Sequence, residues 1–124
     1  MITYHPSDTP PHIVVEAEGF LSGPEVRRVL APMKDHLRAL EPGFVIMALY
    51  PDLVMLKGEA IETLFYYIAR MFDADPGLFI MVDGNHSPHP GLRAFVEQLG
   101  EENQVQFVAT REEGEALIDE YANR

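Results

Sequence analysis

The sequence predicts an α/β fold: a mainly parallel sheet with one antiparallel edge strand and about four crossover or flanking helices. Two continuous apolar runs, residues 44–49 and 78–82, have the character of strands covered on both faces. They alternate with segments whose apolar residues recur at helical spacing, which favours parallel strands joined by helices. Residues 2–5 and 12–18 flank a Pro-rich turn and predict an opening antiparallel pair. With no repeat or long linker, residues 1–124 are expected to form a single domain.

The first helix is predicted to begin at Ser22-Gly-Pro-Glu25, where Ser22 is the N-cap and Glu25 completes a capping box. Pro32 lies inside the helical pattern and is expected to kink it, and Pro42-Gly43 ends it. The predicted buried stripe comprises Val26, Val29, Leu30, Met33, Leu37 and Leu40.

The second helix is predicted over residues 58–72, after the turn Lys57-Gly58-Glu59. Gly58 is expected to be its N-cap, since glycine is an acceptable cap although it has no hydroxyl. Tyr66 should point outward and Tyr67 partly into the core. The predicted buried stripe comprises Ile61, Leu64, Phe65, Ile68, Met71 and Phe72.

The remaining elements complete the alternation. A third helix is predicted to end at Leu99, with Ser87 as its cap, and residues 105–108 should form a fourth inner strand. Thr110 is the expected cap of the last helix, with Glu113 as its reciprocal partner. The predicted apolar side of that helix comprises Ala116, Leu117 and Tyr121.

Composition excludes several classes of function. The formal net charge is −11, with 9 Lys+Arg against 20 Asp+Glu, so neither nucleic acid nor an anionic lipid surface is an expected partner. The chain contains no cysteine, which excludes disulfides and thiolate zinc sites and fits a reducing cytoplasm. No secretory signal and no apolar run of about 20 residues is present, so we expect a cytoplasmic protein without membrane insertion.

A polar loop after the apolar run 78–82 is a candidate ligand or metal site. It carries Asp83, Asn85, His86 and His89, and ligands in open α/β sheets bind outside the carboxyl ends of the strands. Imidazoles with a carboxylate suit zinc or another divalent metal. The same residues also fit a polar turn that leads into the next helix. No metal or cofactor is part of the favoured interpretation.

Signals for catalysis are weak. The chain has no Gly-x-Ser-x-Gly, no P-loop and no Gly-x-Gly-x-x-Gly pattern, so we expect a protein that is not an enzyme. An anion could bind the backbone N–H groups that follow Lys57 and Gly58, but Glu59 opposes this.

The order of elements resembles that of a STAS domain, the module shared by anti-sigma-factor antagonists and sulfate transporters. The resemblance covers nearly the whole chain and rests on HIVVEAEGFLSGPEVRRVL, on the closing VQFVATREEGEALI and on the lengths of the elements. It implies a STAS-like fold and a regulatory, non-enzymatic protein that binds another protein.

In regulatory members of that family, an Asp-Ser pair precedes the second helix, and a partner kinase phosphorylates the serine. The resemblance places Lys57-Gly58 at those positions, and residues 53–61 contain no Ser or Thr. It therefore implies a regulator without the usual serine phosphoswitch. The partner-binding residues that it implies are Lys57, Gly58, Glu59, Glu62 and Tyr66.

Two other functions remain open at this stage. Helices that cover a sheet can enclose an apolar pocket for a lipid-like small molecule, and the 6 Met and 7 Phe residues would suit one. A metal-dependent enzyme could use Asp83, His86 and His89. The partner could also be a second copy of the chain, since homodimers are common.

Overall fold

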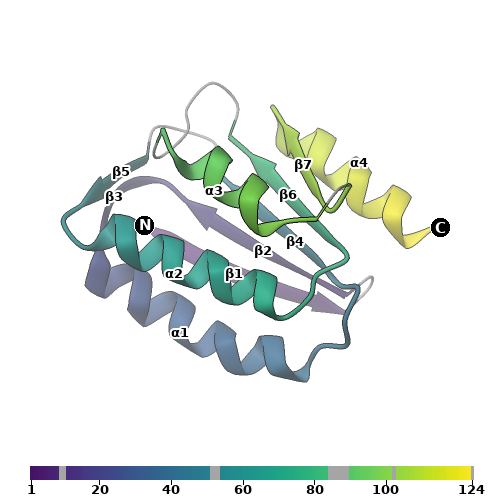
Figure 1. Cartoon of the computed structure of the whole chain (residues 1–124), viewed down its shortest axis with the longest axis horizontal. Coiled ribbons are helices and arrows are strands. Elements are labelled where there is room, and N and C mark those ends of the chain that lie inside the picture. The colour runs from purple at the N-terminus through teal and green to yellow at the C-terminus, as the bar shows by residue number, and fades with distance from the viewer. Residues whose placement is uncertain (9–10, 51–53, 84–89, 102, 124) are drawn as a thin grey trace.

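The centre of the molecule is a five-stranded sheet with the order β1-β2-β4-β6-β7 (Figure 1). The computed structural model describes all residues except 9–10, 51–53, 84–89, 102 and 124. The strands of this sheet are β1 (Ile2–Asp8), β2 (Pro11–Ala17), β4 (Val45–Leu49), β6 (Leu78–Val82) and β7 (Val105–Val108). β1 pairs with β2 antiparallel and the other pairs are parallel. The predicted α/β class, with its antiparallel edge, is therefore confirmed.

Four helices cover the two faces of the sheet. They are α1 (Gly23–Ala39), α2 (Ala60–Asp73), α3 (Leu92–Leu99) and α4 (Arg111–Ala122). The first three contribute to one apolar cluster and α4 contributes to the other. The alternating side chains of the central strands divide between these clusters: Ile46 and Ala48 face α1 and α2, whereas Val45 and Met47 face α4. Both faces of β4 and β6 are buried, as their continuous apolar runs predict.

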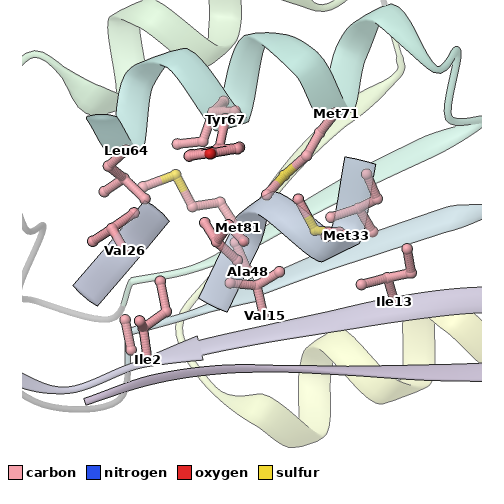
Figure 2. Close-up of a cluster of buried hydrophobic side chains, with 14 of the residues drawn as sticks. Ile2, Ile13, Val15, Val26, Met33, Ala48, Leu64, Tyr67, Met71 and Met81 are labelled. Carbon is pink, nitrogen blue, oxygen red and sulfur yellow. The ribbon is translucent and has the colours of Figure 1, made fainter. Parts of the chain in front are cut away.

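The larger cluster lies between the sheet and the helix pair α1 and α2 (Figure 2). Met33 and Met71 reach into it from the two helices, and Val15 and Ala48 meet them from the sheet. The predicted stripes supply most of the helical side: seven of their twelve residues are buried and the other five are partly buried. Tyr67 is 5% exposed and belongs wholly to this core, which goes beyond the partial burial expected from the sequence.

The helix α4 packs closely on the other face of the sheet. A Cβ at Gly114 would lie 3.2 Å from Val82 Cγ2, so glycine permits this approach. Ile118 is buried and Leu117 and Tyr121 pack around it, but Ala116 is exposed. The assignment of Ala116 to the apolar side of the helix is therefore wrong, because the buried stripe runs through Gly114 and Ile118 instead.

A second, two-stranded sheet was not predicted. It pairs β3 (Gly19–Ser22) with β5 (Val54–Lys57) in parallel. Each strand has only four residues, and the pairing joins segments more than 30 positions apart, which no local pattern can indicate. We call this element the ribbon.

Several boundaries differ from their predictions. β7 is an edge strand with partly exposed residues, so it is not a fourth inner strand. α1 includes Pro32 within its 17 residues and ends at Ala39, before Pro42-Gly43, while the kink expected at Pro32 stays a prediction. α3 begins at Leu92, with Gly91 in the N-cap position, and the predicted cap, Ser87, lies outside the described residues. The predicted caps Ser22 and Thr110 are confirmed, since their hydroxyl oxygens accept from the N–H groups of the residues three positions on.

Within the described ranges, none of the helices combines the length and apolar character that a membrane span requires.

Candidate functional site

The turn before α2 passes through the left-handed region of backbone conformation at Gly58, where φ is +54°. The N-cap of α2 is the next residue, Glu59, and its side chain makes no capping bond. The prediction that Gly58 caps the helix is therefore wrong by one residue. The backbone conformation explains the glycine at position 58, because residues with a Cβ rarely adopt a positive φ. A serine at this position would consequently be strained.

The start of α2 is held against the start of α1. Arg27 Nη2 lies 3.7 Å from Glu59 Oε2, and a Cβ added to Gly23 would lie 2.9 Å from the Cβ of Glu59. Beside this junction is an open hollow of about 280 Å³. It is lined by Arg27, Glu59, Glu62, Thr63, Tyr66 and Tyr67. Three of the five predicted partner-binding residues therefore share one hollow.

Tyr66 points outward, as predicted, and is 46% exposed. Its hydroxyl accepts a hydrogen bond of 2.9 Å from Lys34 Nζ on α1. Lys34 and Arg70 also lie 5.2 Å and 5.4 Å from the centre of its ring. The hydrogen bond from Lys34, with the positive charges of Lys34 and Arg70, lowers the pKa of the Tyr66 hydroxyl. Tyr66 is thus an aromatic surface surrounded by cations.

The ribbon presents the most exposed apolar side chains near this turn. Phe20 and Met55 are register partners on β3 and β5, and they are 61% and 47% exposed. Leu21, between Phe20 and the helix start, is fully buried, as expected when side chains alternate along a strand. Lys57 Nζ lies 5.0 Å from the centre of the Phe20 ring. We call Phe20, Met55 and Lys57 the ribbon patch.

The predicted partner-binding residues follow one another along the chain from the ribbon into α2. Lys57 belongs to the ribbon patch, Gly58 forms the turn, and Glu59, Glu62 and Tyr66 line the hollow. Phe20 was missed by the sequence reasoning. Its signal was an exposed position beside a buried leucine, which can be recognised only once β3 is known to be a strand.

Asp83 follows β6 and is 3% exposed. Its Oδ2 accepts a hydrogen bond of 3.0 Å from Arg93 Nε on α3, and the Arg93 guanidinium lies 4.3 Å from the centre of the Phe107 ring. Asp83 Oδ1 has no hydrogen-bond partner in the described part of the chain. Oδ2 of Asp83 therefore takes part in an ion pair with Arg93, which was not predicted from the sequence.

The other residues of the predicted ligand or metal loop, Asn85, His86 and His89, lie outside the described residues. Among the residues that are described, no group of three or more His, Asp or Glu side chains could hold a metal ion. The idea of a metal site at this loop therefore stays a prediction.

Tyr50 is the neighbour of Asp83 at the carboxyl ends of the central strands. It is 2% exposed, and its N–H donates to Val82 O over 2.8 Å. Burial, reinforced by the negative charge of Asp83, raises the pKa of the Tyr50 hydroxyl far above its ordinary value. Figure 1 places this end of β6 at the same end of the molecule as the ribbon and the start of α2.

No protein-family model, curated protein or solved structure matches this chain.

Proposed function

We propose that this chain is a non-enzymatic, cytoplasmic regulatory module that binds a protein partner through the ribbon patch and the start of α2. The observation that carries the proposal is the ribbon patch itself. Phe20 and Met55 are large apolar side chains, they are paired on adjacent strands, and both are about half exposed or more. Apolar and aromatic side chains that project together in this way are typical anchors of protein interfaces.

The resemblance to STAS domains supports the same surface. That resemblance rests on the order and lengths of the elements, which include the opening antiparallel pair and the closing helix. In STAS-like regulators the start of the second helix and its neighbouring loops meet the partner, which corresponds here to Lys57, Gly58, Glu59, Glu62 and Tyr66. The proposal includes the loss of the serine phosphoswitch: Gly58 lacks a hydroxyl, and its positive φ disfavours a serine there.

Site-specific photocrosslinking tests this function. A benzophenone amino acid at position 20 or 55 should give one discrete adduct in cells of the source organism. The same probe at Gln98, which is exposed on α3, is the matched control and should give none. The mass of the adduct distinguishes another protein from a second copy of the chain. The proposal fails if positions 20 and 55 give no adduct, or give the same products as position 98.

A further inference from the structure

A second hollow, of about 390 Å³, lies between the C-terminal halves of α1 and α2. It is separate from the ribbon patch. Its polar lining comprises Lys34, Arg38, Arg70 and Asp73. Its apolar lining comprises Leu37, Leu40 and Ala74, of which Leu37 is buried. The volume falls within the range of about 300 to 1,000 Å³ that is common for small-molecule sites.

The charge of this hollow is opposite to that of the chain. Three of the nine Lys and Arg residues line it, although the formal net charge of the protein is −11. Two of them have carboxylate partners: Arg70 Nη2 lies 2.9 Å from Asp73 Oδ2, and Arg38 Nη1 lies 3.4 Å from Asp35 Oδ1. The four side chains of these two ion pairs are exposed. Exposed ion pairs contribute little to stability, so an incoming anion can compete for the guanidinium groups.

Lys34 differs from Arg38 and Arg70, because no carboxylate among the described residues forms an ion pair with its ammonium group. Its ammonium group donates a hydrogen bond of 2.9 Å to the Tyr66 hydroxyl. Arg70 is placed by the same tyrosine, since its guanidinium lies over the ring. Tyr66 therefore acts as a positioning residue, because it contacts one cation from each helix among those that line the hollow. The lowered pKa of its hydroxyl is consistent with a positive potential there.

We propose that this hollow binds a small organic anion, a carboxylate or a phosphate monoester with a short apolar chain. Lys34 and Arg70 hold the anionic group, and the apolar chain lies on Leu37, Leu40 and Ala74. Arg38 and Arg70 also lie in the last turns of α1 and α2, where positive side chains stabilise the helix dipoles. That purely structural role predicts no preference for any ligand, so ligand binding separates the two explanations.

Calorimetric titration with four octyl probes tests the proposal: octanoate, octyl phosphate, octanol and octyltrimethylammonium. Octanoate or octyl phosphate should bind at least tenfold more tightly than the neutral and cationic probes, and added salt should weaken the binding. The stronger of the two anions identifies the head group. Lys34→Met should weaken the binding at least fivefold, and Lys34→Met with Arg70→Met should abolish it.

Arg28→Met is the matched control, because Arg28 is exposed on the same helix and lines neither hollow. It should bind the anions as the unaltered chain does. The proposal is overturned if octanol binds as tightly as octanoate, if Arg28→Met weakens binding as much as Lys34→Met, or if neither anion binds the folded, unaltered protein at millimolar concentration. These outcomes leave the ribbon patch untouched, so this site and the proposed function can fail independently.

Discussion

Replacing Arg93 with methionine should destabilise the protein, because it leaves the buried Asp83 carboxylate without its ion-pair partner. Asp83 is 3% exposed, and its Oδ1 has no hydrogen-bond partner in the described part of the chain. The substitution would also remove the hydrogen bond that Oδ2 accepts from Arg93. Breaking a buried ion pair costs about 3–5 kcal/mol. The Arg93 side chain is 51% exposed, so water can partly replace it, which places the expected loss nearer 2–3 kcal/mol.

The assay is a double-mutant cycle measured by urea unfolding at pH 7. Asp83→Asn removes the charge and keeps the shape of the side chain, so Arg93→Met should cost less in that background. The two substitutions together should destabilise the protein by at least about 1 kcal/mol less than the sum of the single losses. The control is Arg38→Met, which breaks an exposed pair with Asp35 and should cost about 0–1 kcal/mol.

Two results would refute this reasoning. One is a loss for Arg93→Met no larger than that for Arg38→Met, and the other is strict additivity within the cycle. Either would mean that the Asp83 carboxylate does not depend on Arg93 in the folded state.

The remaining predictions concern backbone strain, close packing and alkaline pH. Gly58→Ala should cost about 1–2 kcal/mol from its positive φ alone, since no atom lies within 4 Å of the added Cβ; an unchanged urea midpoint would contradict this. Gly77→Ala should cost more, about 2–3 kcal/mol or above, because its Cβ would meet the Tyr121 hydroxyl and lie 2.8 Å from the backbone oxygen of Gly43; equal losses at positions 58 and 77 would refute the ranking. The raised pKa of Tyr50 gives stability that is complete below the unfolded pKa of about 10 and is lost as pH rises above it. Between pH 9 and pH 11 the unaltered chain should therefore lose about 1.4 kcal/mol more than Tyr50→Phe, and parallel losses in urea unfolding would count against the shift.

The sequence predicts elements whose signals are local. The strands β4 and β6 are continuous apolar runs, and the caps Ser22 and Thr110 bond to residues only three positions away. The ribbon could not be predicted because it pairs segments more than 30 positions apart, and the outward direction of Phe20 follows only from its place on β3 opposite Met55. Likewise, the lysine that donates a hydrogen bond to Tyr66 lies 32 positions earlier, on another helix. Spacing within α2 cannot indicate that contact.

Gly58 lies between the ribbon, which carries the ribbon patch, and α2, which contributes to the second hollow. Only two residues, Gly58 and Glu59, separate the end of β5 at Lys57 from the start of α2 at Ala60. The ribbon patch and the outer face of α2 are therefore joined by a short connection. The chain has two lysines, and each lies over an exposed aromatic ring, Lys57 over Phe20 and Lys34 over Tyr66. In a protein with a net charge of −11, this places positive charge where aromatic surface is available for contact. A partner at the ribbon patch and an anion in the second hollow would therefore each meet a cation beside an aromatic ring, while the acidic remainder of the surface disfavours anionic ligands elsewhere.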